Sequence, residues 1–399
     1  MVKIGGNCVN SFGADSNLEL GTRNFQGYAG FLPMLIQGKN PETSELETIE
    51  LAGPGADIGG TGNWLAPGLI DLQVNGFAGV DFNTPATGVE DYRRAVRRLW
   101  TTGVARFLPT VITGGRERIE ACLRAAAAAA RDPEIGPAIA GIHLEGPYIS
   151  PEDGPRGAHP GEHVRAPDRD EFRRFQDAAG GAIRLVTVAP EVRGGVAFIE
   201  WLAGQGLVPA IGHTAAAENQ IKDAIQAGAK LSTHLGNGAH GMLPRHPNYI
   251  WDQLAADELS ASFIVDGVHL APAVVKTFVR AKGVERSILI TDAVAPAACP
   301  PGLYQVGEVP IELTPAGRVQ IRGTDRLAGS ALQLHNAVGN TMRFAGVSLA
   351  AALAMATANP ARLLGLPARR DDWVLFDLDD AGRISIRATV CAGRVVFQC

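Results

Sequence analysis

The sequence predicts an α/β protein: a (β/α)₈ TIM barrel with a small β-sandwich-like domain formed by the two chain ends. From about residue 65 onward, short apolar runs alternate with amphipathic segments of helical length. Continuous apolar strands that alternate with helices are typical of a parallel sheet covered on both faces. There are eight such runs, which is the number of strands in a TIM barrel.

The predicted strands are apolar runs bounded by glycine, proline or polar residues. They cover residues 69–74, 104–112, 138–145, 183–188, 207–212, 230–234, 261–265 and 287–291. Apolar residues at helical spacing predict helices between several of them, at 116–131, 168–179, 196–205 and 215–227. Two further apolar helices, at 332–344 and 349–357, are expected to pack on the outside of the barrel.

The two chain ends have a different character from the middle. Residues 1–64 are polar, rich in glycine and only weakly strand-like, whereas 373–378, 383–388 and 394–397 are predicted to be three short strands joined by turns. We expect residues 1–64 and 367–399 to form the small β domain and residues 65–366 to form the barrel. A disordered N-terminal arm is the alternative for the first segment.

Charge and composition exclude several classes of function. With 36 basic and 41 acidic residues the net charge is -5, so no strong field would recruit nucleic acid or an anionic membrane. The N-terminus has no apolar stretch of signal-peptide length, and no window approaches the roughly 20 apolar residues that a membrane span needs. The five cysteines are scattered and never form a CxxC pair, which indicates reduced thiols in the cytoplasm.

Polar residues gather where the predicted strands end, and in a TIM barrel this is where the chemistry lies. They are Gln73, Asn75, His143, Glu145, His213, Thr233, His234, Asn237, Asp266, His269, Thr291 and Asp292. If the strand assignments hold, these side chains converge on one mouth of the barrel, however far apart they are in the sequence.

Among these residues, Glu145, His213 and His234 are the predicted metal ligands. A catalytic zinc keeps three protein ligands and an open position for water, whose pKa the ion lowers. Asp292 is then the natural base to accept the proton of that water. Each residue alone has an ordinary explanation, such as a hydrogen-bonded structural histidine, a turn or a helix N-cap. Their occurrence at successive strand ends favours a metal-dependent active site.

Several motifs together resemble the N-acetylglucosamine-6-phosphate deacetylases of the amidohydrolase superfamily. The matching pieces are APGLIDLQVNGFAGVDFN, HLEGPYIS, GAHP, IGHTAA, THLGN, DGVHL, ITDAVAPA, LAGSALQL and ATANPARLLGL, in the family's order from about residue 66 to 366. HLEGP followed by ITDA is specific in combination, whereas a single piece such as IGH is not.

The resemblance implies roles for the residues near the reacting bond. Glu145, His213 and His234 would hold the metal, and Asp292 would act first as general base and then as general acid. His159, in GAHP, would hydrogen-bond the acetamide carbonyl and stabilise its developing negative charge.

The resemblance also implies a binding site for the sugar phosphate and a homodimer. Asn237 and the backbone of Gly238 would contact the phosphate, with His269 alongside. Arg245 would reach the phosphate in the neighbouring subunit's site, since a guanidinium matches phosphate geometry.

One divalent ion per subunit is expected. Where many amidohydrolases have His-x-His for a second metal, this chain has Gln73 and Asn75, and amides are poor zinc ligands. Gln73 is therefore grouped with the substrate-binding residues. Zn²⁺ is the expected ion, with Fe²⁺, Co²⁺ or Mn²⁺ as alternatives.

The loop at 236–253 departs from the family pattern. Its sequence differs around Arg245, and it carries the additional side chains of His240, His246 and Trp251. These side chains are either packed within the loop or able to change the preferred acetamido sugar, phosphorylated or not. The first 64 residues also lack the usual pattern of short strands.

Three functions are compatible with the sequence. The first is hydrolysis of the acetamide of N-acetylglucosamine 6-phosphate, or of a close N-acetylhexosamine phosphate, to acetate and the amino-sugar phosphate. The second is an amidohydrolase of the same fold acting on a non-phosphorylated acetamido sugar, an N-acyl amino acid or a cyclic amide. A non-catalytic, metal-stabilised barrel is the third. The phosphate cluster of Asn237, Arg245 and His269 favours the first.

Overall fold

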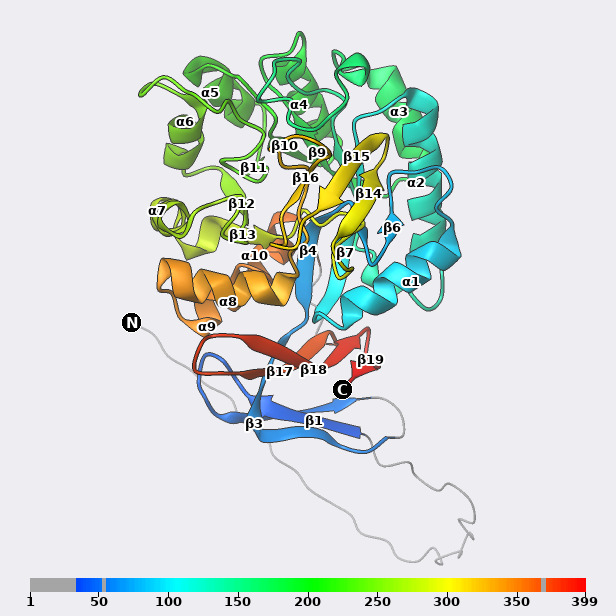
Figure 1. Cartoon of the computed structure of the whole chain (residues 1–399), viewed down its shortest axis with the longest axis vertical. Helices are drawn as coiled ribbons and strands as arrows, with labels where there is room; N and C mark the ends of the chain where they lie inside the picture. Colours follow the sequence, from blue (N-terminus) through cyan, green and yellow to red (C-terminus); the bar gives the residue numbers. More distant parts are fainter. Residues whose placement is uncertain (1–33, 52–54, 367–370) are drawn as a thin grey trace, which may run out of the picture. The chain divides into compact units, whose positions relative to one another are not determined.

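A closed barrel of eight parallel strands forms the centre of the molecule (Figure 1). The computed structural model describes residues 34–51, 55–366 and 371–399. In sheet order the strands are β4 (Leu69–Val74), β7 (Val104–Ile112), β8 (Ile142–Glu145), β9 (Ile183–Val188), β10 (Val208–Ile211), β11 (Leu231–Ser232), β12 (Ser260–Ile264) and β13 (Ser287–Ile290). A parallel bridge between Val74 and Ala293 joins the first strand to the segment that follows the last. The predicted TIM barrel is confirmed.

Helices surround this barrel, and the longer ones pack against it through an apolar face. In α1 (Val89–Trp100) the buried residues include Tyr92, Ala95, Val96 and Leu99, which lie on one face of a helix. The others are α2 (Arg116–Ala130), α3 (Arg169–Ala178), α4 (Gly195–Gly204), α5 (Glu218–Gln226), α6 (Tyr249–Ala255), α7 (Pro272–Lys282), α8 (Leu334–Ala345), α9 (Leu349–Ala354) and α10 (Ala358–Leu363). The helices α1, α6, α7 and α10 were not among those predicted, although α1 carries a clear helical period.

The predicted strand 138–145 is too long at its beginning. Gly136–Ala138 is a turn of 3₁₀ helix, and pairing with the next strand begins only at Ile142. Gly141 has a φ of 144°, a conformation that other residues rarely adopt. The backbone therefore turns just before the strand, and upstream of the turn only an isolated bridge from Ile139 to Phe107 joins the barrel.

The two chain ends meet in a six-stranded sheet next to the barrel. Its order is β2 (Leu46–Leu51), β1 (Met34–Lys39), β3 (Ile58–Pro67), β17 (Trp373–Leu378), β18 (Ile384–Cys391) and β19 (Arg394–Gln398). The antiparallel pairing of β3 with β17, from Trp373–Pro67 to Phe376–Trp64, links the two ends. The fold class is therefore confirmed in both its parts. The division into 1–64 with 367–399 and 65–366 stays a prediction, and its residues 1–33, 52–54 and 367–370 lie outside the described residues.

A three-stranded antiparallel sheet follows the last barrel strand and was not predicted. It comprises β14 (Gly302–Val306), β15 (Val309–Leu313) and β16 (Val319–Ile321), drawn in yellow in front of the barrel in Figure 1. Val306, Ile311 and Leu313 form an apolar cluster with Ile112 and Val294, which lie at the ends of barrel strands. The sheet is thereby anchored beside the mouth of the barrel.

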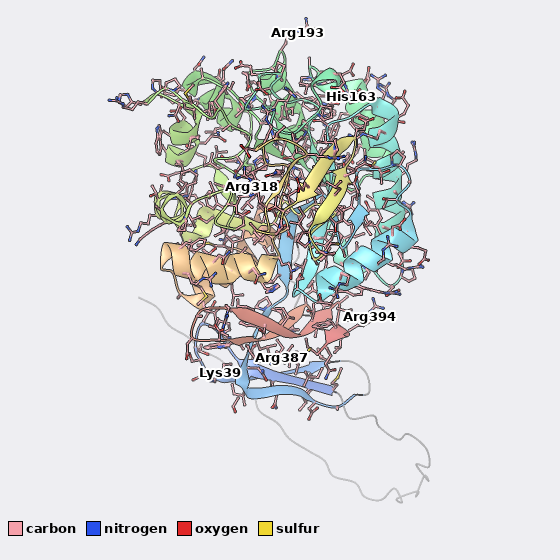
Figure 2. The ribbon with its side chains drawn as sticks, viewed as in Figure 1. Lys39, His163, Arg193, Arg318, Arg387 and Arg394 are labelled. Atoms are coloured by element: carbon pink, nitrogen blue, oxygen red, sulfur yellow. The ribbon has the colours of Figure 1, made fainter. Side chains whose placement is uncertain are left out.

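Basic side chains are spread over several elements. Figure 2 labels Lys39 on β1, Arg387 on β18 and Arg394 on β19, all in the six-stranded sheet, and Arg318 just before β16. Within the described ranges, no helix is long and apolar enough to cross a membrane.

Candidate metal and active site

One cavity at the mouth of the barrel gathers most of the polar side chains predicted at the strand ends. Five of them do not line it: Gln73, His143, Thr233, Asp266 and Thr291. The cavity has a volume of about 120 Å³. It is lined by Asn75, Ile112, Glu145, Gly157, Ala158, His159, His213, His234, Asn237, Gly238, Ile264, His269, Asp292, Val294, Val306, Leu327, Ala328 and Gly329. Because the strands are parallel, their carboxyl ends all lie at this mouth, as the sequence predicted.

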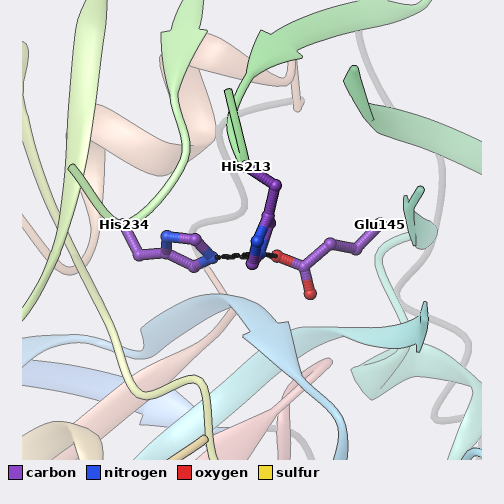
Figure 3. Close-up of side chains that lie close together, drawn as sticks. All are labelled: Glu145, His213 and His234. Carbon is purple, nitrogen blue, oxygen red and sulfur yellow. Dashed lines mark hydrogen bonds and ion pairs between the residues drawn. The ribbon is translucent and has the colours of Figure 1, made fainter. Parts of the chain in front are cut away.

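Glu145, His213 and His234 point toward one another from three strand ends (Figure 3). Oε1 of Glu145 lies 3.2 Å from Nε2 of His213 and 2.9 Å from Nε2 of His234. The two Nε2 atoms are 3.1 Å apart, and all three residues are buried. This arrangement brings one ligand atom from each residue to a common point.

The donor set fits a divalent metal ion. Two donors at 2.0–2.1 Å from a tetrahedral zinc ion lie about 3.3 Å apart, close to the separations observed. The backbone oxygen of Pro155 lies 2.8 Å from Nδ1 of His213 and so receives the proton of that nitrogen, which leaves the Nε2 lone pair for the metal. Glu145, His213 and His234 therefore form a group that can hold a metal ion.

The charge distribution supports an ionised carboxylate at this point. Burial raises the pKa of Glu145, but the hydrogen bonds and charges of His213 and His234 outweigh this effect and hold the pKa well below its usual range. A carboxylate that stays ionised is a good ligand for a cation.

Asp292 lies beside this group and is held by two amides. Nε2 of Gln73 donates to Oδ1 of Asp292 at 3.1 Å and also to Oε1 of Glu145 at 2.9 Å. Nδ2 of Asn75 donates to the same Oδ1 at 2.6 Å. Burial and the charge of Glu145 raise the pKa of Asp292 to about 6, although His234, His269 and Asn75 oppose the rise. Gln73 thus connects the two carboxylates that the sequence assigned to different tasks.

His159 reaches the cavity from the loop after β8. Its ring packs edge-on against His213, with centroids 4.3 Å apart, and Nδ1 lies 2.8 Å from Oγ1 of Thr113. Burial lowers the pKa of His159 to about 3, so the ring is neutral.

His269, Asn237 and Gly238 also line the cavity. Nδ1 of His269 lies 2.7 Å from Oδ2 of Asp266, whose other oxygen accepts two backbone N–H groups. The side chain of Asn237 donates to the backbone oxygen of His234 at 3.2 Å. The sequence predicted these three residues as contacts of the sugar phosphate, and that role stays a prediction.

Other residues singled out in the sequence lie elsewhere. Arg245 and His246 are exposed and do not line the cavity, and Trp251 is 49% exposed. His240 packs against Tyr249 and lies 3.3 Å from a carboxylate oxygen of Glu152. The additional side chains of loop 236–253 are therefore not part of the cavity in a single chain.

Several residues at the site were not identified from the sequence. Thr113 directly follows β7 and would have been found by the same strand-end rule that found the others. Leu327, Ala328 and Gly329 belong to the LAGSALQL motif, which carried no specific role. Val306 comes from the unpredicted three-stranded sheet, and nothing in its local sequence indicates that it lies at the cavity.

Comparison with known proteins adds to this geometry. Residues 64–369 match the amidohydrolase family. The chain is 34% identical to N-acetylglucosamine-6-phosphate deacetylase from Bos taurus over 381 residues, which cover 90% of this chain and 89% of that protein. It is also 34% identical to N-acetylgalactosamine-6-phosphate deacetylase from Escherichia coli O157:H7 over 325 residues, or 81% and 83% of the two chains.

Solved structures show the same relationship. A mutant N-acetyl-D-glucosamine-6-phosphate deacetylase from Mycobacterium smegmatis, in complex with N-acetyl-D-glucosamine 6-phosphate, matches with a TM-score of 0.81 and 31% identity. The match covers 92% of this chain and 100% of that one. The similarity therefore extends over the barrel and beyond it.

Proposed function

The chain belongs to the amidohydrolase family, within the group of N-acetylglucosamine-6-phosphate deacetylases, and we propose that it hydrolyses the acetamide of an N-acetylhexosamine 6-phosphate. The products are acetate and the amino-sugar phosphate. The observation that carries the proposal is the convergence of Glu145, His213 and His234 beside Asp292 in one cavity. N-acetylglucosamine 6-phosphate is our first choice of substrate, and the Escherichia coli relative makes the galactosamine epimer the next.

We infer one divalent ion per subunit, held by Glu145, His213 and His234, and assign it as Zn²⁺. The same ligands also accept Fe²⁺, Co²⁺ or Mn²⁺. The side-chain amides of Gln73 and Asn75 stand where relatives with two metals place histidines, and both donate to Asp292. A second ion would have to displace these hydrogen bonds. When bound, the single ion polarises the attacking water and lowers its pKa.

Asp292 and His159 carry out the proton transfer and the charge stabilisation in this proposal. Asp292 accepts the proton of the attacking water and then passes it to the leaving nitrogen. His159 donates a hydrogen bond to the acetamide oxygen as negative charge develops there. The two amides on Oδ1 fix the orientation of Asp292 and leave its other oxygen, Oδ2, for proton transfer.

The sugar phosphate contacts Asn237, the backbone of Gly238 and His269 of the same chain, all of which line the cavity. We assign Arg245 to the phosphate in the partner's site, which makes the functional unit a homodimer. Its exposed position away from its own cavity supports this assignment. The nearby Met242 and Trp251, exposed to 92% and 49%, offer apolar surface that a second copy would cover.

We place the protein in the cytoplasm. Cys122, Cys299 and Cys399 carry free thiols, which are usual in reducing compartments. We propose a small phosphorylated sugar as the protein's partner.

The proposed activity is tested by acetate release from N-acetylglucosamine 6-phosphate, from its galactosamine epimer and from unphosphorylated N-acetylglucosamine. We expect removal of the phosphate to lower kcat/KM by at least tenfold.

Arg245→Ala should raise KM for the phosphorylated sugar about tenfold or more, since a charge-assisted pair contributes roughly 1.5–3 kcal/mol. Arg280→Ala, an exposed arginine on α7, is the matched control and should change nothing. An unchanged kcat/KM without the phosphate would exclude the proposed substrate, and an unchanged KM in Arg245→Ala would remove that residue from the site.

A further inference from the structure

The hydroxyl of Thr113 lies directly behind the catalytic histidine of the proposed reaction. Thr113 is fully buried and follows the last residue of β7, whose partner in the register is Glu145. Its Oγ1 lies 2.8 Å from Nδ1 of His159. Thr113 does not line the cavity, so it can act on the substrate only through His159.

The position of this hydroxyl is closely defined by its surroundings. Gly146 follows Glu145, has a φ of 76° and faces Thr113 across the strand pair. A Cβ at Gly146 would collide with Oγ1 of Thr113. The glycine of the HLEGP motif thus leaves room for this hydroxyl next to a metal ligand.

Only one nitrogen of His159 is left for the substrate. Nδ1 is occupied by Thr113, and the ring face packs against His213. Nε2 is therefore the atom that can meet the acetamide oxygen in the cavity. To stabilise negative charge on that oxygen, Nε2 must carry a proton, and in a neutral imidazole Nδ1 must then be an acceptor.

Thr113 can provide the proton that this tautomer requires. Among the described residues, the only other acceptor within reach of its hydroxyl is the backbone oxygen of Glu145 at 3.4 Å, which is near the limit of a hydrogen bond. The contact with Nδ1 is 0.6 Å shorter (3.4 minus 2.8). The geometry favours donation to the histidine over donation to the carbonyl.

We propose that Thr113 is a positioning residue that donates its hydroxyl proton to Nδ1 of His159 and thereby keeps Nε2 protonated as the donor to the acetamide oxygen. This inference rests on the proposed deacetylase function. A carboxylate in place of the hydroxyl would favour a proton on Nδ1, which is the arrangement that Asp266 gives His269, another histidine that lines the cavity. The two histidines are thus prepared for different tasks by their different partners.

Thr113→Val tests the proposal because it keeps the shape and removes the hydroxyl. We expect kcat on N-acetylglucosamine 6-phosphate to fall about 10- to 100-fold, with KM changed less than about threefold and the metal content unchanged, because loss of an oxyanion donor acts on kcat. Thr113→Ser keeps the hydroxyl and should recover most of the lost rate. Thr341→Val removes a buried hydroxyl on α8 outside the site and should leave kcat unchanged.

Two kinetic outcomes would overturn the proposal. One is a folded, metal-loaded Thr113→Val variant with near-normal kcat, and the other is a serine variant as slow as the valine variant. If the valine variant does not fold, ¹⁵N NMR of the His159 ring in the wild-type enzyme decides the tautomer. A proton on Nε2 is expected, and a proton on Nδ1 alone would contradict the proposal. Failure of the wild type to release acetate would instead refute the proposed function, since the NMR result does not depend on turnover.

Discussion

His213, His234 and Asp292 have φ values of 50°, 30° and 51°, in the left-handed region that residues other than glycine seldom adopt. Each follows a barrel strand, where the chain turns sharply out of the sheet. Such conformations cost of order 1–3 kcal/mol each and persist where the surrounding structure holds them. Here the backbone is held by hydrogen bonds, as from the Asp292 N–H to the backbone oxygen of Gln73 at 3.0 Å. The strained turns aim these side chains at one point.

Asp292→Asn tests the assignment of Asp292 as the general base. An asparagine can keep its Oδ1 on the amides of Gln73 and Asn75, so we expect the fold and the metal to be retained. It cannot accept a proton, so kcat should fall by about 10²–10⁴. Acetate release and the metal content of the purified protein measure the two effects. Asp380→Asn, in the exposed turn after β17, is the control, and a near-normal kcat in Asp292→Asn would refute the assigned mechanism.

At the scale of elements, the sequence predicted best where burial is complete. All nine residues of β7 are buried, and its apolar run marks both of its ends. Glu145, His213, His234 and Asp292 could be predicted to lie close together because they stand at or just after the ends of such runs. Their roles as metal ligands and general base stay predictions. The strands β14 to β16 were missed because many of their residues are only partly buried. Their position beside the barrel mouth depends on packing against Ile112 and Val294, and neither residue is a sequence neighbour of these strands. The packed position of His240 likewise depends on a contact with Glu152 that local sequence does not encode.

The helix α8 carries a histidine whose surroundings predict a pH-dependent stability. His335 borders a small cavity otherwise lined by Leu69, Val338, Leu353, Val374, Phe376, Ile384 and Ile386, from the barrel, two helices and the small sheet. Burial in these apolar surroundings lowers the pKa of His335 to about 4 from the ordinary 6.5. The neutral form is therefore the one that fits this junction.

Below pH 6.5 the unfolded chain binds a proton at this histidine, whereas the folded protein does so only near pH 4. The stability that the neutral ring provides is therefore present above pH 6.5 and is lost as the pH falls toward 4. Between pH 7 and 5 the loss should be about 2 kcal/mol. We expect His335→Gln to reduce the difference in unfolding free energy between pH 7 and 5, as measured by urea titration, by this amount. His246→Gln, at an exposed loop position, should not, and equal pH dependence in wild type and His335→Gln would contradict the assignment.

At the scale of the whole molecule, barrel closure makes the site. The site is assembled from four different strand ends, which carry Glu145, His213, His234 and Asp292. The first and last of these residues are 147 positions apart in the sequence (292 minus 145). The last strand is joined to the first by hydrogen bonds such as that from Oγ1 of Thr291 to Oδ2 of Asp71 at 2.6 Å. This junction between β4 and β13 places Asp292 beside Gln73 and so next to Glu145. The fold class could be predicted from the sequence because the pattern of an apolar strand followed by a helix recurs along the chain. The distances between the predicted ligands arise only when the barrel closes.

The location of the metal ion tests this account most directly. We expect anomalous diffraction from crystals of the zinc-loaded protein to show one ion per chain, bonded to a carboxylate oxygen of Glu145 and to Nε2 of His213 and His234 at about 2.0–2.2 Å. Asp292 should lie close enough to hydrogen-bond the water on the open position. An ion bound elsewhere, or two ions with Gln73 or Asn75 as ligands, would contradict the account.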